Sequence, residues 1–121
     1  MAKSVADSVL DGALNVIATA DIMTACSAEP TNRTEAVTTY ALADVTMSGG
    51  DYTNANGDTS GRKVTVAQKT GVTIDTTGTA THVALCDGTN LLYVTTCTSQ
   101  ALTSGNTMTF QQWKVELADP S

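Results

Sequence analysis

Apolar and polar residues alternate along most of the second half of the chain, which is the pattern of half-buried β-strands. In "WKVEL" the side chains of Trp113, Val115 and Leu117 face one way, and those of Lys114 and Glu116 face the other. The same alternation occurs in "KVTVAQ", "VTID", "THVALC", "LLYVTTC" and "TMTF". The short segments between these runs ("KTG", "TTGT", "DGTN", "SGN" and "QQ") punctuate them as hairpin turns do, most clearly in "CDGTNL". The pattern predicts a mainly β protein, an antiparallel β-sandwich or small barrel.

The N-terminal segment has helical periodicity instead. Ser4 suits an N-cap and Asp7 lies in the first turn, which favours helix initiation. Gly12 in the interior lowers helix stability by about 1 kcal/mol relative to alanine, so we expect the helix to depend on docking onto its own sheet or onto a neighbouring molecule. An apolar stripe follows the helix from Val5 to Thr19, made of Val5, Val9, Ala13 and Ile17 with Leu10 and Leu14 beside them.

The remaining segments complete a single domain. "DIMTACS" is a plausible short strand, and Pro30 in "AEPTNRT" enforces an extended or turn geometry. "EAVTTYALADVTM" fits a helical turn at its start and a strand at its end. Threonine accounts for 23 of 121 residues and favours extended backbone. We therefore predict one β-rich domain over residues 1–121, with a helix over 4–20 and a β-sandwich over 21–121.

The charge balance restricts the partners. Twelve acidic and six basic residues give a net charge of −6. Such a surface repels phosphates, and no basic cluster with interleaved aromatic residues overcomes this, so nucleic acid is not an expected partner. The longest weakly charged run, around "ALNVIATADIMTA", is too short to span a bilayer, and the N-terminus has no signal-like apolar region. These features predict synthesis in a cytosol and no membrane partner.

The stretch "DYTNANGDTSGRK" (Asp51–Lys63) has the composition of a calcium loop. Aligning it on Gly57 as an EF-hand places amides at the third and fifth positions, but Tyr52 and Lys63 occupy the first and twelfth, where carboxylates are needed. We therefore expect no metal site, and interpret the stretch as a long exposed polar turn and a candidate contact loop. Its candidate contact residues are Asp51, Tyr52, Asn54, Asn56 and Asp58.

His82 is the only histidine, so any imidazole chemistry must use it. Cys86 follows it by four residues on the same face of a strand, a separation of about 13 Å. No nucleophile, phosphate-loop or dinucleotide-binding motif accompanies it. The position of each acidic residue is explained by a turn or by a solvated strand face, without a catalytic role. The pattern thus predicts a partly exposed sheet histidine, no catalytic residue and no cofactor.

Three cysteines, Cys26, Cys86 and Cys97, lack the spacing of a zinc site. In a cytosolic product we expect buried, reduced thiols. The alternative is a disulfide, within the chain or between subunits, that forms after release into an oxidising exterior. Cys86 and Cys97 lie at different heights of a predicted hairpin, so they are not expected to bridge directly.

The run "YALADVTMSGGDYTNANGDTSGRKVTVAQKTGVTIDTTGTATHVALCDG", with "LLYVTTCTSQALTSGNTMTF" and "WKVELADPS", resembles small structural proteins of tailed bacteriophages and prophages. The resemblance spans most of the chain, including "SVLDGALNVI", and rests on overall texture without catalytic signatures. It implies a β-sandwich located in the virion after synthesis in the bacterial cytoplasm. Its implied partners are the major capsid protein or neck proteins, and copies of itself as a homo-oligomer.

Three classes of function follow. The first class is a structural virion protein, expected as a capsid decoration or cement protein first and as a neck or collar protein of the head–tail junction second. A carbohydrate- or receptor-binding β module would be favoured by an exposed Trp113 or Tyr52 beside acidic loop residues. An enzyme would need His82 beside a cysteine or carboxylate in a pocket.

Overall fold

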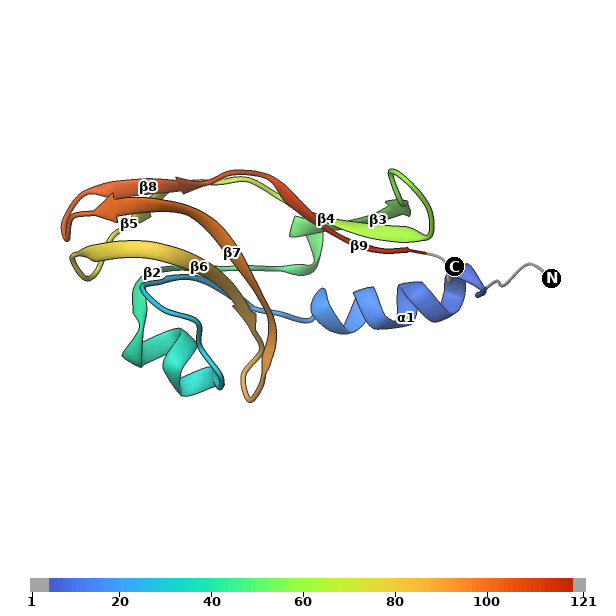
Figure 1. Ribbon diagram of the computed structural model, residues 1–121, viewed down its shortest axis with the longest axis horizontal. Coiled ribbons are helices and arrows are strands. Elements are labelled where there is room, and N and C mark those ends of the chain that lie inside the picture. Colours follow the sequence, from blue (N-terminus) through green and yellow to red (C-terminus); the bar gives the residue numbers. More distant parts are fainter. Residues whose placement is uncertain (1–4, 119–121) are drawn as a thin grey trace.

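A computed structural model describes residues 5–118 and shows a mainly β fold of antiparallel sheets with one N-terminal α-helix, as the pattern predicted (Figure 1). Residues 5–118 form one α-helix, a short π-helix, a 3-10 turn and nine strands. In chain order these are α1 (Asp7–Ile17), β1 (Ile22–Cys26), η1 (Glu35–Thr39), β2 (Ala41–Thr46), η2 (Gly49–Asp51), β3 (Tyr52–Asn56), β4 (Arg62–Val66), β5 (Lys69–Thr73), β6 (Gly78–Cys86), β7 (Leu91–Leu102), β8 (Thr107–Phe110) and β9 (Trp113–Leu117).

The strands form three antiparallel sheets, with orders β2-β1-β6-β7, β3-β4-β9 and β5-β8. The four-stranded sheet is one layer, and β5 and β8 cover it as a second layer (Figure 1). A bridge between Ala43 and Ile74 joins β2 to β5, so the two layers are linked along that side. On the other side β7 and β8 belong to different sheets, and residues 5–118 form no closed barrel.

The central strands of the four-stranded sheet carry apolar residues on both faces, and both faces are buried. Met23 and Leu85 face the main core between the layers, while Cys26 and Cys86 face the opposite side. η1 covers that opposite side through the buried Ala36. The segment "EAVTTYALADVTM" is therefore a helical turn followed by strand β2, and each half serves the same sheet.

Only one of the predicted turns joins two paired strands. "DGTN" closes the β6–β7 hairpin, where the Asp87 carboxylate accepts hydrogen bonds from the backbone N–H groups of Thr89 and Asn90. "TTGT", "SGN" and "QQ" link strands of different sheets, so their assignment to hairpins was wrong. "KTG" lies inside β5, where Gly71 has a φ of 66° next to a shift in the β5–β8 register. That glycine marks a bulge and not a turn.

Helix α1 docks onto the β3-β4-β9 sheet through one side. Leu14 is fully buried and packs in a cluster with Val64 and Val115. Beside this contact, Nε of Arg62 lies 2.8 Å from a carboxylate oxygen of Asp11. The predicted helix is confirmed, but it begins at Asp7 with an N-cap that has no side-chain hydrogen bond, and Ser4 lies outside the described residues.

The inward side of α1 differs from the predicted stripe. Leu14 contacts the sheet, whereas Val9 is 62% exposed and Ala13 is also exposed. The apolar residues of α1 form one broad arc of about 160° of its circumference, so periodicity alone did not decide which part of that arc would dock. The ion pair of Asp11 with Arg62 connects the helix to the same sheet that buries Leu14.

Truncating a buried and an exposed apolar residue of α1 should have different effects on stability. Leu14→Ala is expected to lower the free energy of unfolding by about 2–5 kcal/mol, because it opens a cavity in a closed cluster. Val9→Ala, at an exposed position of the same helix, is expected to change it by less than about 0.5 kcal/mol. Urea denaturation followed by circular dichroism measures both. Equal losses would contradict the assigned rotation of the helix.

Candidate functional site

The outward side of α1 is an exposed apolar surface. Val9 and Val16, 62% and 56% exposed, are the exposed large hydrophobic residues of the described chain. They are seven residues apart and so share one side of the helix, with the exposed Gly12 and Ala13 between them. A Cβ added at Gly12 would meet no atom within 4 Å, so nothing in the described chain covers this position. We call these four residues the outward α1 face.

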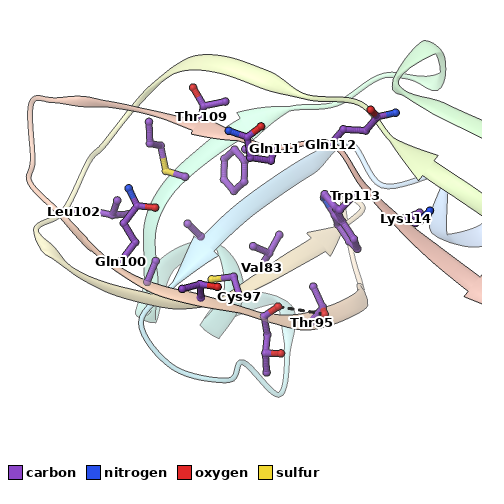
Figure 2. A pocket seen from close by; sticks show the side chains of 16 residues that line it. Val83, Thr95, Cys97, Gln100, Leu102, Thr109, Gln111, Gln112, Trp113 and Lys114 are labelled. Carbon is purple, nitrogen blue, oxygen red and sulfur yellow. Dashed lines mark hydrogen bonds between the residues drawn. The ribbon is translucent and has the colours of Figure 1, made fainter.

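A second feature is a groove of about 470 Å³ along the side where the two layers are not linked. Strand β7 forms one wall, and β8 with the start of β9 forms the other. Figure 2 shows the side chains that line the groove, with Cys97 and Gln100 on the β7 wall and Gln111 and Trp113 on the other. The groove exists because β7 is the last strand of its sheet and makes no backbone ladder with β8 or β9.

The floor of this groove is apolar and its rim is polar. Small or branched residues of the central strands (Ala25, Ala80 and Val83) lie at the bottom, and the buried Phe110 lines the β8 wall. Around the rim are threonine hydroxyl groups and three exposed glutamine amides, Gln100, Gln111 and Gln112.

The groove is almost free of charge. Between Asp87 and Lys114 the chain contains no charged residue, and this uncharged segment includes all of β7 and β8. Lys114 is the one charged residue among those that line the groove. In a protein with a net charge of −6, this is a distinct neutral surface.

Trp113 occupies the end of the groove nearest β9. It is half-buried, and its ring stacks on Tyr93 with centroids 5.9 Å apart and an interplanar angle of 27°. The indole Nε1–H is buried without a hydrogen-bond acceptor among the described residues. Trp113 also lines an adjoining hollow of about 240 Å³ that includes Lys63 and Thr65. The stacking holds the indole in place where the groove and the hollow meet.

The predicted contact loop Asp51–Lys63 is mostly strand, so its interpretation as one long turn was wrong. Tyr52–Asn56 is β3 and pairs with β4 in a regular antiparallel register, leaving residues 57–61 as the turn. Gly61 has a φ of 70°, and a Cβ there would lie 1.9 Å from the carbonyl oxygen of Leu117. That position therefore requires glycine.

Most polar groups of this hairpin make contacts within the protein. The Tyr52 hydroxyl donates to the carbonyl of Ala20 at 2.9 Å, and burial raises its pKa to about 12. The Tyr52 side chain is half-buried and not an exposed platform, as a sugar-binding role would have required. The other candidate contact residues each have a partner: Asp51 pairs with Lys69, Asn54 donates to Asn15, and Asn56 accepts from Arg62.

Asp58 in the β3–β4 turn forms ion pairs with residues of two strands, β4 and β9. Its carboxylate accepts hydrogen bonds from the ammonium groups of Lys114 and Lys63, which lower the pKa of Asp58 to about 2. Its backbone N–H donates to the Glu116 carboxylate. Residues 5–118 contain no group of three His, Cys, Asp or Glu side chains placed to hold a metal ion.

His82 is a half-buried residue of β6 and lies outside the groove lining. Its Nδ1 is 2.9 Å from the Thr81 hydroxyl oxygen. In the β1–β6 ladder it stands opposite Cys26, and this pairing could not be predicted from the sequence. The Cys26 thiol is already engaged, donating to the carbonyl of Ala36 at 3.5 Å and lying 3.3 Å from the Thr24 hydroxyl.

All three cysteines are free thiols. Cys26 and Cys86 are buried and Cys97 is half-buried in the groove wall. Burial raises the pKa of each thiol, that of Cys86 to about 11. Cys86 stands opposite Leu91 at the hairpin end while Cys97 is further along β7, the difference in height that the sequence predicted. These thiols are kept protonated, which is unfavourable for nucleophilic chemistry.

Two carboxyl groups that are far apart in sequence interact on the surface near β2. Partial burial raises the pKa of Asp44, and the hydrogen bond with Asp75 and its negative charge add to this. The Asp75 backbone N–H donates to the carbonyl of Leu42, which brings the two residues together. Sequence reasoning could not pair them, because the contact depends on β2 lying beside β5.

The chain matches no family model, no curated protein and no solved structure. Among the described residues, no helix has both the length and the apolar character to cross a membrane.

Asp44→Asn should stabilise the protein at neutral pH. The raised pKa of Asp44 means that ionising it opposes folding, a penalty that is absent below about pH 3.8 and develops as pH rises through the folded-state pKa. Because Asp44 is largely exposed, the gain at pH 7 is expected to be below about 1 kcal/mol. Thermal unfolding at pH 7 and pH 3 measures it, and an equal change at both values would contradict the carboxyl pair.

Asp75→Asn is the matched control, since it removes the other member of the pair. Its gain should be smaller, because the partial burial that contributes most to the raised pKa of Asp44 remains in this variant. The double substitution should stabilise by less than the sum of the two single changes.

Proposed function

We propose that this chain is a non-enzymatic structural protein of a tailed-phage virion, and that it binds the capsid surface as a decoration or cement protein. The observation that carries the proposal is the outward α1 face. Exposed valines seven residues apart, with small residues between them, have the spacing with which helices anchor in apolar grooves of partner proteins.

The size of this face favours a repetitive partner. An 11-residue helix is about 16 Å long and about 10 Å wide, so one face offers roughly 160 Å². A stable interface between two proteins buries about 800 Å² on each side. A single α1 contact is therefore weak, and it becomes effective where copies bind side by side on a regular lattice. A capsid provides such a lattice, and neighbouring copies of this chain would add contacts to one another.

The state of the candidate catalytic groups agrees with a binding role. The Cys26 thiol is engaged with Thr24 and Ala36, and burial keeps it protonated. His82 lies in a strand outside the groove. An enzyme of the kind considered from the sequence would need these two groups free and directed into a pocket.

The copy number in purified particles tests the proposal. Quantitative mass spectrometry of virions of a phage that encodes this chain should give near-parity with the major capsid protein. A small multiple of the portal copy number would overturn decoration in favour of the neck or collar alternative. Absence from the particle would overturn both.

A pair of variants tests the role of the outward α1 face. Val9→Glu with Val16→Glu should reduce the particle-bound copy number at least about 10-fold, because two charges would have to be desolvated on docking. Gln68→Glu with Thr70→Glu adds the same charge at exposed positions around the start of β5, outside the outward α1 face, and should leave the copy number unchanged. Circular dichroism establishes that both variants fold. Equal losses would show that added charge alone, and not this face, governs binding.

A further inference from the structure

We propose that the groove between β7 and the β8–β9 wall binds a neutral, hydroxyl-rich ligand, an oligosaccharide segment. This inference does not depend on capsid binding, since the groove and the outward α1 face share no residue. Its volume of about 470 Å³ lies within the range of small-ligand sites.

The charge of the groove defines the ligand class. Its walls come from the uncharged segment between Asp87 and Lys114, so neither an anionic nor a cationic ligand would find a matching group along most of its length. The Lys114 ammonium is already engaged by the Asp58 carboxylate. A neutral ligand can occupy such a groove without leaving an unpaired charge.

The hydrogen-bonding groups of the rim suit hydroxyl groups. Gln100 on β7 and Gln111 between β8 and β9 come from opposite walls, and both side chains are exposed (Figure 2). Each amide offers two donors and one acceptor oxygen, and a sugar hydroxyl both donates and accepts. Threonines 95, 96, 98 and 109 add hydroxyl groups that rotate to suit either role.

Trp113 supplies an apolar surface against which the C–H face of a sugar ring can pack. Stacking on Tyr93 immobilises the indole, so little conformational entropy is lost when a ligand packs against it. The C–H face of a pyranose ring packs well on an aromatic ring, and the rest of the floor, with Ala25, Ala80 and Val83, is apolar as well. The indole N–H is itself buried, so the part of Trp113 offered to a ligand is its apolar ring surface.

An added peptide strand suits the groove less well. Along the β6–β7 ladder, Ala80 pairs with Gln100 and His82 pairs with Thr96, so only Thr81 stands opposite residues 97–99 of β7. This bulge interrupts the backbone of the wall at the middle of the groove. Pairing with an incoming strand requires a regular edge, which a bulge removes.

The single tryptophan makes the test direct, because Trp113 is the only indole and lines the groove. The full-length protein is titrated with maltotriose, cellotriose and tri-N-acetylchitotriose up to about 20 mM while its emission is recorded. We expect a saturable change for at least one of these probes. No saturable change for any of the three would overturn the proposal.

Variants tie the response to the groove. Gln100→Ala with Gln111→Ala should weaken the midpoint at least about 10-fold, while Gln68→Ala, an exposed glutamine outside the groove, should leave it unchanged. Amide chemical shifts report the same titrations without relying on the indole, and unchanged spectra of the free variants establish that they fold. A response unaffected by the double substitution would overturn the assignment to this groove.

Discussion

The structure is organised by a sheet that must be covered on both faces. Residues 23–26 of β1 are fully buried, including the polar Thr24, whose hydroxyl oxygen lies 3.3 Å from the Cys26 sulfur. One face meets the second layer through Met23 and Leu85, and the other meets η1 through Ala36. A sheet of this kind is stabilised by burying apolar area on both faces. It therefore requires one cover on each face, and the second layer and η1 provide these two covers.

The cover on the core side is incomplete, and this produces the groove. The layers meet along β2 and β5 through the Ala43–Ile74 bridge, whereas β7 and β8 each end a sheet. Unpaired strand edges attract other strands, and proteins commonly protect them with charges or bulges. This edge carries no charge, and the bulge over residues 97–99 of β7 is its protection. The same bulge places Cys97 in the groove wall.

Local patterns predicted the elements better than their pairing. Alternation located β4 and β9, because the more buried residues alternate with the more exposed ones along each strand. It also located β6, although both faces of that strand are buried. The β6–β7 hairpin was predictable since the Asp87 carboxylate closes the turn within the hairpin itself. Strand β3 was missed because its residues are polar, and it is held by its ladder with β4 and by the hydrogen bond from Tyr52 to Ala20.

The groove could not be predicted from the sequence for a related reason. The "SGN" segment has the composition of a hairpin turn, yet β7 and β8 do not pair, and only that absence of pairing opens the groove. From the sequence, a carbohydrate- or receptor-binding role would have been favoured by an exposed Trp113 beside acidic loop residues. The structure places glutamine amides and threonine hydroxyls there instead, drawn from segments that alternation treats only as polar strand faces.

The distribution of charge connects the two surfaces. At the α1 end, the charged groups pair within the fold. Asp11 of the helix pairs with Arg62 of β4, and Asp58 of the β3–β4 turn pairs with Lys63 of β4 and Lys114 of β9, so the helix, the turn and two strands are linked. This leaves the outward α1 face uncharged between Val9 and Val16. The segment that lines the groove needs no such pairs, because it contains no charge at all before Lys114. Since α1 and β8 lie at opposite ends of the molecule (Figure 1), an apolar partner on the helix and a neutral ligand in the groove do not compete for the same surface.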